Sequence, residues 1–390
     1  MQEETTETKT KELENKSSEN TFEDIALLNA LASFRPCTTS LKLHELIKYT
    51  GSAEKAWAIP DETLEQYGWT TELRENFNRH RNHFNIEQEF QKLYEQNISF
   101  VSFYSPKYPT ILRTIFDPPL GLYVRGTLPE NNLSIAFVGS RKATPYGKTA
   151  TNMLVRPLAS KGVTIVSGLA YGIDAEAHRA TLSVHGTTVA VLGNGCDEPT
   201  MYPRAHRELA RQIITEGGAV ISEYPPGTPG LSYYFPQRNR IVSGLSRALV
   251  IIEAGEKSGA LITARLALDQ NREVFALPGP ITSETSRGTN SLLREGASPA
   301  LSAEQIIETL ELFSLFGERK IQQIPTKNGL SDTPLADDEK VLAILSSTPI
   351  TIDKIVEDSK LPSNVVSSII TMLEIDGLVK DTGGRNYARI

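Results

Sequence analysis

Two groups of basic residues stand where phosphate chemistry can be expected. Arg141 and Lys142 directly follow an apolar run, and Arg238 and Arg240 bracket Asn239 further along the chain. Arginine binds phosphate through a planar fork of N–H groups, and lysine binds it as a point charge. The two groups therefore predict contacts to a phosphate backbone.

The segment Ser167–His178 has the composition of a turn that an anion can approach. Gly168 and Gly172 carry no side chains, and Asp174 opens a helical pattern behind them. Backbone N–H groups at a helix N-terminus attract negative charge when nothing covers them. The alternative interpretation is structural: Asp174 caps its own helix, and His178 is a buried histidine.

Aromatic residues beside the second basic group could bind bases. Phe235, or Tyr233 and Tyr234 next to it, could stack on a base, a contact worth ~1–3 kcal/mol in single-strand binders. The alternative for the two tyrosines is a place in the core. The alternative partner for the arginines is an internal carboxylate such as Glu223 or Glu253.

Alternating strand and helix patterns would position these residues. Strands are expected at 133–138, 163–166, 187–192, 219–222, 248–252 and 273–277, and helices near 147–161, 175–184, 204–215 and 261–270. Val, Ile and Ala without polar alternation indicate strands covered on both faces, which predicts an α/β fold with a doubly wound, Rossmann-like parallel sheet. Because ligands bind beyond the carboxyl ends of such strands, the polar motifs are expected to converge on one edge.

Known nucleotide motifs are excluded. Gly147-Lys-Thr149 ends like a phosphate-binding loop, but Lys142 stands where its first glycine belongs. A dinucleotide site needs an acidic residue at the end of the second strand, where Ser167-Gly168 stands. No paired carboxylates, metal-ligand cluster or Ser/His/Asp set is indicated by spacing, so no catalytic residue, cofactor or metal is predicted.

The composition is that of a globular protein of two or three domains: 390 residues, 39% apolar and 22% charged. The net charge is −7, yet between Ile135 and Glu308 17 Lys and Arg stand against 15 Asp and Glu, so the centre is slightly basic. No apolar run reaches the ~18 residues of a membrane span, and no signal peptide is indicated. A cytoplasmic protein with Cys37 and Cys196 as reduced thiols is expected.

The expected domains differ in composition. Residues 1–21 suit a disordered tail, 22–100 a small helical domain of the SAM-like or helix-hairpin-helix kind, and 101–312 the sheet domain. Prolines around 117–126 favour a short strand on the sheet edge. Residues 313–334 suit a linker, and 335–390 suit a winged helix-turn-helix.

The winged helix-turn-helix has an unusual charge for a duplex reader. Its expected third helix, 363–376, contains no Lys or Arg, and from Pro334 onward 6 Lys and Arg stand against 9 Asp and Glu. Because phosphate contacts need basic residues, a protein-contact or accessory role is expected for this module.

Several spaced motifs in the same order resemble the DprA (Smf) family of DNA-processing proteins. They are Gly139-Ser-Arg141, Ser167–His178, Phe235–Ile241, Ser258–Ala264 and Gly288–Ala297. The resemblance implies a homodimeric single-stranded DNA-binding protein that protects incoming DNA and helps load the RecA recombinase in natural transformation. The candidate DNA- and phosphate-binding residues are Gly139, Ser140, Arg141, Lys142, Ser167, Gly168, Gly172, Asp174, Arg204, Phe235, Arg238, Asn239, Arg240, Ser258, Gly259, Thr263 and Asn290.

An enzyme is the alternative, since nucleotide-cleaving phosphoribohydrolases share a related doubly wound fold. Their signature resembles Pro-Gly-Gly-x-Gly-Thr followed by glutamate, and the nearest segment, Glu253–Thr263, has neither the glycine pair nor the trailing acid.

The dimer interface is expected near the last strand of the sheet. The helix 261–270 and the segment Ser291–Leu293 supply more leucine side chains than an edge helix needs, among them Leu268 and Leu292. The alternative is that these leucines all lie in the core.

Overall fold

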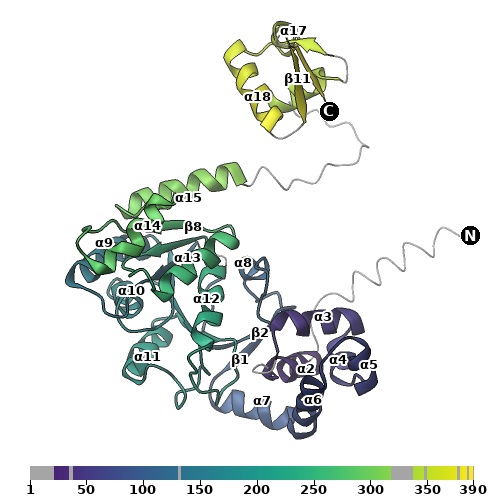
Figure 1. Cartoon of the computed structure of the whole chain (residues 1–390), viewed down its shortest axis with the longest axis vertical. Helices are drawn as coiled ribbons and strands as arrows, with labels where there is room; N and C mark the ends of the chain where they lie inside the picture. Colours follow the sequence, from purple (N-terminus) through teal and green to yellow (C-terminus); the bar gives the residue numbers. More distant parts are fainter. Residues whose placement is uncertain are drawn as a thin grey trace, which may run out of the picture. The chain divides into compact units, whose positions relative to one another are not determined.

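The computed structural model describes residues 22–34, 38–130, 133–317, 337–346, 349–375, 378–383 and 386–389 (Figure 1). Contacts between residues divide the chain into two units, 1–320 and 321–390, and each is described by itself. The expected tail, residues 1–21, and residues 318–334 of the expected linker lie outside the described residues.

Buried runs of Val, Ile and Ala form a nine-stranded sheet in the larger unit. Branched side chains suit strands that are covered on both faces. The strands are β1 Ser99–Ser102, β2 Gly121–Gly126, β3 Ser134–Val138, β4 Thr164–Ser167, β5 Thr188–Leu192, β6 Ala219–Ser222, β7 Ala248–Ile251, β8 Glu273–Ala276 and β9 Ser298–Pro299. Their order across the sheet is β1-β2-β6-β5-β4-β3-β7-β8-β9.

Strands β3 to β9 are parallel, and the winding reverses at β3. From β3 the chain proceeds outward through β4, β5 and β6, and it then crosses to the other side of β3 with β7 and β8. This arrangement confirms the predicted doubly wound α/β fold. A crevice for ligands is expected where the order reverses, at the carboxyl ends of β3 and β7.

The expectation of an edge strand within 117–126 is wrong. β2 is antiparallel to β1 on one side and to β6 on the other, with Val124 opposite both Ser99 and Ile221. The edge is β1, from a segment that follows the N-terminal helices. Pro118 and Pro119 precede β2, so they remove no hydrogen bond from its ladder.

Helices cover both faces of the sheet (Figure 1). α9, α10 and α15 share a buried cluster on one face with Phe137 and Ile165, while α12, α13 and α14 pack on the other with Val166 and Ile251. The helices are α8 Thr110–Arg113, α9 Pro145–Ser160, α10 Ile173–Leu182, α11 Arg207–Thr215, α12 Tyr234–Gly244, α13 Gly259–Asp269, α14 Arg287–Arg294 and α15 Ala303–Gly317, with short 3-10 turns at Arg204–His206 and Glu284–Ser286.

Two helices have ends that need an explanation. The motif Phe235–Arg240 lies in α12, where Pro236 falls in the first helical turn and its missing N–H costs nothing. The linker was expected from residue 313, but α15 continues to Gly317. Its Ile306 and Leu310 are buried against the sheet domain, which stabilises the helix near that end.

The N-terminal region of the larger unit is helical. It comprises α2 Phe22–Ser33, α3 Ser40–Thr50, α4 Ala53–Trp57, α5 Asp61–Gln66, α6 Thr71–His83 and α7 Ile86–Glu95. Leu31, Leu64 and Phe77 form its core, and Leu120 from the start of the sheet region belongs to the same cluster. The Tyr123 hydroxyl of β2 also donates to Asn29 Oδ1 at 2.7 Å. The helices are thus packed directly on the sheet domain.

The smaller unit has a winged-helix fold. Its elements are α16 Asp337–Ile344, β10 Ile350–Thr351, α17 Ile352–Ser359, α18 Ser363–Ile375, β11 Val379–Gly383 and β12 Asn386–Arg389. The strands form a sheet in the order β10-β12-β11, and Val341, Ile355, Val366 and Ile370 lie in its core. The predicted winged helix is confirmed. Among the described residues of both units, no helix combines the length and apolar character needed to cross a bilayer.

Candidate nucleic-acid interface

Two loops pack tightly at the carboxyl edge of the sheet because one position is glycine. Gly172, at the start of α10, has φ 78°, and a Cβ built there would lie 2.2 Å from the carbonyl oxygen of Ser140. The Ile173 N–H donates to the same carbonyl at 3.1 Å. Only glycine allows this backbone conformation and approach without strain. The loop that carries Arg141 is therefore fixed against the loop between β4 and α10.

In the loop between β4 and α10, two backbone N–H groups donate to a carboxylate of this chain. Asp174 Oδ2 accepts from Gly168 N at 3.1 Å and from Ala170 N at 3.3 Å, while Ser167 Oγ donates to the carbonyl of Phe137. Asp174 is buried, and burial raises its pKa although the charge of Arg238 acts in the opposite direction. The structural interpretation of Asp174 is thus favoured over an anion site at Gly168.

Arg238 donates a hydrogen bond to this loop. Its guanidinium donates to the carbonyls of Gly168, at 2.9 Å, and Val191, and its Nε donates to Asn239 Oδ1 at 3.3 Å. A Cβ at Gly168 would lie 2.5 Å from the guanidinium. Burial lowers the pKa of Arg238 to about 10. Because its donors face the protein interior, Arg238 positions the loop and has no donor directed at a ligand.

Arg141 is the exposed arginine of this edge. Its guanidinium carbon lies 5.8 Å from the ring centroid of Phe235, within the range of a cation–π contact. Among the described residues, the side chains of Arg141, Lys142 and Arg204 form no hydrogen bond or ion pair, and all three side chains are exposed. These basic side chains are available for phosphate groups.

Exposed aromatic rings lie in the segments next to Arg141 and Phe235. Tyr202 lies 5.7 Å from Phe235 between ring centroids, Tyr171 lies 5.0 Å from His206, and Tyr233 is also exposed. Each tyrosine exposes 45–53% of its surface, so part of each ring faces solvent. Tyr234, in contrast, is buried with its ring 4.1 Å from Tyr224. Three rings and one arginine thus offer flat surfaces on which bases can stack.

Tyr171 and Tyr202 were not selected from the sequence. Their rings are large and apolar, so the pattern alone favours burial. The available signal was position: Tyr171 lies in the turn after β4, and Tyr202 stands two residues before Arg204. Residues in loops at the carboxyl edge of a doubly wound sheet face the ligand side.

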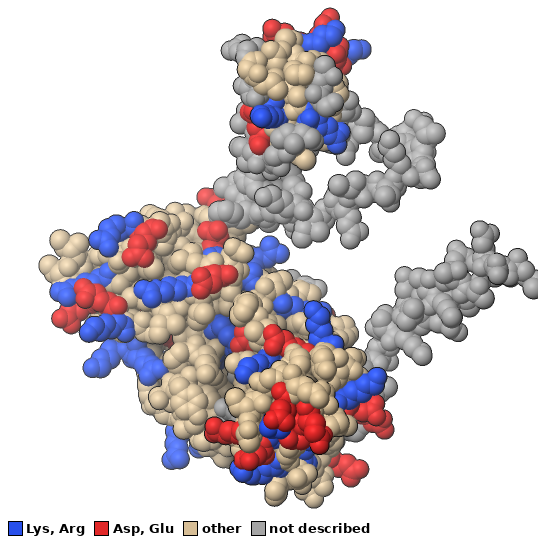
Figure 2. Space-filling view, turned by 45° about the vertical axis from the view of Figure 1, so that its right-hand side comes forward, with Lys and Arg blue, Asp and Glu red and all other residues tan. Residues whose placement is uncertain are grey.

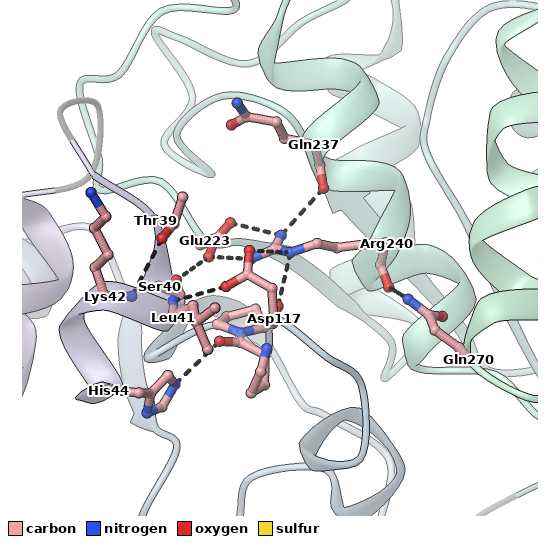
Figure 3. Close-up of polar contacts among 12 residues, drawn as sticks. Thr39, Ser40, Leu41, Lys42, His44, Asp117, Glu223, Gln237, Arg240 and Gln270 are labelled. Carbon is pink, nitrogen blue, oxygen red and sulfur yellow. Dashed lines mark hydrogen bonds and ion pairs between the residues drawn. The ribbon is translucent and has the colours of Figure 1, made fainter. Parts of the chain in front are cut away.

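Arg240 belongs to an internal ion-pair network, shown in Figure 3. Its guanidinium contacts Glu223 at 2.6 and 2.9 Å and Asp117 Oδ2 at 3.2 Å, and the Ser40 hydroxyl donates to Glu223 Oε1 at 2.6 Å. Leu41 N donates to Asp117 Oδ1 at 2.9 Å. The expectation of a phosphate contact by Arg240 is therefore corrected, since the internal carboxylate takes its donors.

This network joins the N-terminal helices to the sheet domain. Ser40 begins α3, Glu223 follows β6, and Arg240 lies in α12. Burial acts to lower the pKa of Arg240, but the charge of Glu223 and the hydrogen bonds with it outweigh burial and raise the pKa. The guanidinium therefore stays charged and holds three segments that are distant in sequence.

The candidate residues that follow β7 and β8 form hydrogen bonds with nearby backbone groups. Ser258 caps α13, accepting from Ala260 N at 3.3 Å, and buried Thr263 donates to the carbonyl of Gly259 at 3.4 Å. Asn290 pairs with Gly279 through the Gly279 N–H and C=O, at 3.2 and 3.0 Å. The structure does not bring these four candidates into contact with Arg141.

The crevice where the sheet order reverses is filled by Glu253. Its carboxylate accepts from Thr144 N at 2.9 Å and Thr144 Oγ1 at 2.5 Å, at the N-terminus of α9, and from Thr285 Oγ1 at 3.3 Å. A Cβ at Gly147 would lie 2.4 Å from this carboxylate, and Gly139 packs against the backbone of Glu253. An anion of the protein thus occupies the place where a nucleotide phosphate binds in related folds.

His178 is a buried residue of α10. Its Nδ1 lies 2.7 Å from Thr188 Oγ1, and burial, together with the charges of His206 and Arg238, lowers its pKa to about 3. It is therefore neutral at physiological pH and belongs to the core, as the structural alternative proposed. Among the described residues, no group of three or more His, Cys, Asp or Glu side chains is placed to hold a metal ion.

Charge on the visible surface is mixed. In Figure 2, Lys and Arg side chains are interspersed with Asp and Glu, and acidic side chains gather toward the lower right. A nucleic-acid site on this protein is therefore local, as the net charge of −7 indicates.

Comparisons with known proteins match the sheet domain and the winged helix. The family described as DNA recombination-mediator protein A matches residues 99–311, and the DprA winged helix domain matches residues 325–385. Protein Smf of Escherichia coli (strain K12) is 39% identical over 310 residues, covering 78% of this chain and 81% of that protein. DNA processing protein DprA of Bacillus subtilis (strain 168) is 41% identical over 234 residues, covering 58% and 78%.

Among solved structures, DNA processing protein A from Streptococcus pneumoniae is similar with a TM-score of 0.63. It is 30% identical in sequence, and the match covers 73% of this chain and 97% of that one. The family match spans the nine-stranded sheet and the Arg141 site, and the winged helix follows it in the same order. The chain therefore belongs to the DNA recombination-mediator protein A (DprA) family.

Proposed function

We propose that this protein binds single-stranded DNA at the carboxyl edge of its sheet, protects it, and helps to load a RecA recombinase during transformation and recombination. The observation that carries the proposal is the unpaired, exposed Arg141 over Phe235, with Tyr171, Tyr202 and Tyr233 nearby. Arginine supplies the phosphate contact, and the rings supply stacking that any unpaired base can use.

Single strands should bind more tightly than duplex DNA of the same length. Stacking on even one ring is worth ~1–3 kcal/mol and requires a base that is free of its partner, so a preference of roughly tenfold or more is expected. Fluorescence anisotropy with a labelled oligothymidine and a matched duplex, at two salt concentrations, measures both affinities and their salt slopes. Equal affinity for both would contradict a stacking site.

Binding without catalysis is the favoured activity. The buried carboxylates Asp174, Glu223 and Glu253 at this edge are each held by hydrogen bonds from the protein. A general acid or base must reach the proton that it transfers. The phosphoribohydrolase alternative, which would use Glu253, has no specific observation in its favour.

The protein acts as a homodimer through α13. Leu268 exposes 57% and Ile262 45% of their surface on this helix, whereas Leu292 is buried in the core. The expectation that Leu292 lies at an interface is therefore corrected, because its side chain packs from α14 into the core of the sheet domain. Two DNA sites on one dimer would raise the avidity for a long strand.

Leu268→Glu is expected to yield a folded monomer, because a charge on an exposed position costs little in the monomer but much in an apolar interface. Size-exclusion chromatography with light scattering measures the mass. Met153→Glu, at an exposed position of α9, is the matched control and should leave the dimer intact. A monomeric wild type, or a dimeric Leu268→Glu variant, would show that the placement is wrong.

A further inference from the structure

The outer surface of α9 and α10 concentrates basic side chains. From Arg141 to Leu182 the sequence holds six Lys and Arg and two acidic residues, a net charge of +4 (6 − 2) in a chain whose total is −7. One of the two acidic residues, Asp174, is buried.

One hydrogen bond fixes how the two helices face each other. Asn152 Nδ2 of α9 donates to Glu176 Oε1 of α10 at 2.6 Å. Both helices lie on one face and connect successive parallel strands, so they run in the same direction. Side chains one turn further along stay on the same side of each helix, which places Arg156 and Arg179 next to each other.

Lys148 lies one turn in the other direction, toward the loop that carries Arg141. Lys148, Arg156 and Arg179 form what we call the α9/α10 strip. All three are exposed, and among the described residues their side chains form no ion pair or hydrogen bond. The acidic residue nearest to them in this arrangement, Glu176, is hydrogen-bonded to Asn152.

We propose that a DNA strand held at Arg141 continues over the α9/α10 strip, with its phosphates against Lys148, Arg156 and Arg179. Arg156 lies eight residues after Lys148, about 12 Å along the helix, which corresponds to about three to four stacked nucleotides at the ~3.4 Å spacing of one strand in B-DNA. The strip is one pair of helices wide, about 8–10 Å between axes, so it suits a single backbone. This inference rests on the proposed function and extends its site.

The α9/α10 strip predicts that substitutions in it weaken the binding of long single strands but not of short ones. Each lost phosphate contact lowers the salt slope for a single strand by about 0.7, which is roughly fivefold in affinity at 0.1 M salt. Arg156→Ala with Arg179→Ala should therefore weaken binding of a 20-nucleotide oligothymidine about 25-fold and reduce its slope by about 1.4. An oligothymidine of about four nucleotides, short enough to be held at Arg141 alone, should bind within twofold of wild type.

The control is Lys48→Ala with Lys55→Ala, which removes two exposed charges from α3 and α4 and should leave the salt slope unchanged. An unchanged slope for the Arg156 and Arg179 variant, or an equal loss for short and long strands, overturns the strip, because a strand path affects only long strands. A wild type that does not bind the short strand overturns the proposed function itself, so the two failures are distinguishable.

Discussion

An Arg240→Ala variant should lose about 3–5 kcal/mol of unfolding free energy, the cost of removing one partner of a buried ion pair. Glu223 is 2% exposed, so its carboxylate would lose both contacts to the guanidinium without gaining contact with solvent. The two tryptophans, Trp57 and Trp69, lie in or beside the N-terminal helices. Their fluorescence during denaturation with urea therefore reports the loss of the helices that this network holds.

Two comparisons separate the network from a general effect of substitution. Arg156→Ala removes an exposed arginine and should change the unfolding free energy by less than ~0.5 kcal/mol. Arg240→Met combined with Glu223→Gln removes both charges together and should recover much of the loss. If Arg240→Ala unfolds at the same urea concentration as wild type, the network contributes nothing net to stability.

Arg141→Ala should weaken single-strand binding by ~1.5–3 kcal/mol, or roughly 10- to 150-fold, whatever the base sequence. The reason is that, in the proposed site, Arg141 makes a charge-assisted phosphate contact, and its guanidinium also lies over the Phe235 ring. The slope of log affinity against log salt should fall by about 0.7. Titration of a short oligothymidine by fluorescence anisotropy at several salt concentrations measures both quantities.

Arg141→Lys provides the matched control for this prediction. It keeps the charge but loses the planar fork, so the salt slope should stay near wild type while the affinity falls part of the way. The side chain is exposed, so neither variant should alter the urea unfolding curve. Wild-type affinity for a folded Arg141→Ala protein would remove Arg141 from the site.

The sheet could be predicted from the sequence because its signal is local. The expected strand 219–222 coincides with β6. The other predicted strands of the parallel sheet deviate by one residue at one end, except β4, which is shifted by one residue at both ends. Runs of branched residues between glycine-containing turns are distinctive at short range. The two antiparallel strands were harder, since pairing of β1 with β2 depends on packing by the N-terminal helices.

Site residues were harder to predict because their roles depend on distant partners. Arg141 and Arg240 both stand in motifs that suit phosphate, yet Arg240 meets Glu223 and Asp117, which are far away in the sequence. Tyr171 and Tyr234 are the same residue type near the same edge, but one is exposed and the other buried. Composition and spacing identify which side chains carry charge or a ring, while the fold decides which of them face solvent.

The position of Glu253 affects how well free nucleotides can compete with DNA for this protein. Its carboxylate is hydrogen-bonded at the N-terminus of α9, where the phosphate of a free nucleotide would otherwise bind. A group that belongs to the same chain is present at a very high effective concentration, so millimolar mononucleotides cannot displace it readily. Free nucleotides should therefore compete poorly with DNA for this protein. A DNA strand makes many weak contacts outside the crevice, so its binding does not depend on displacing Glu253.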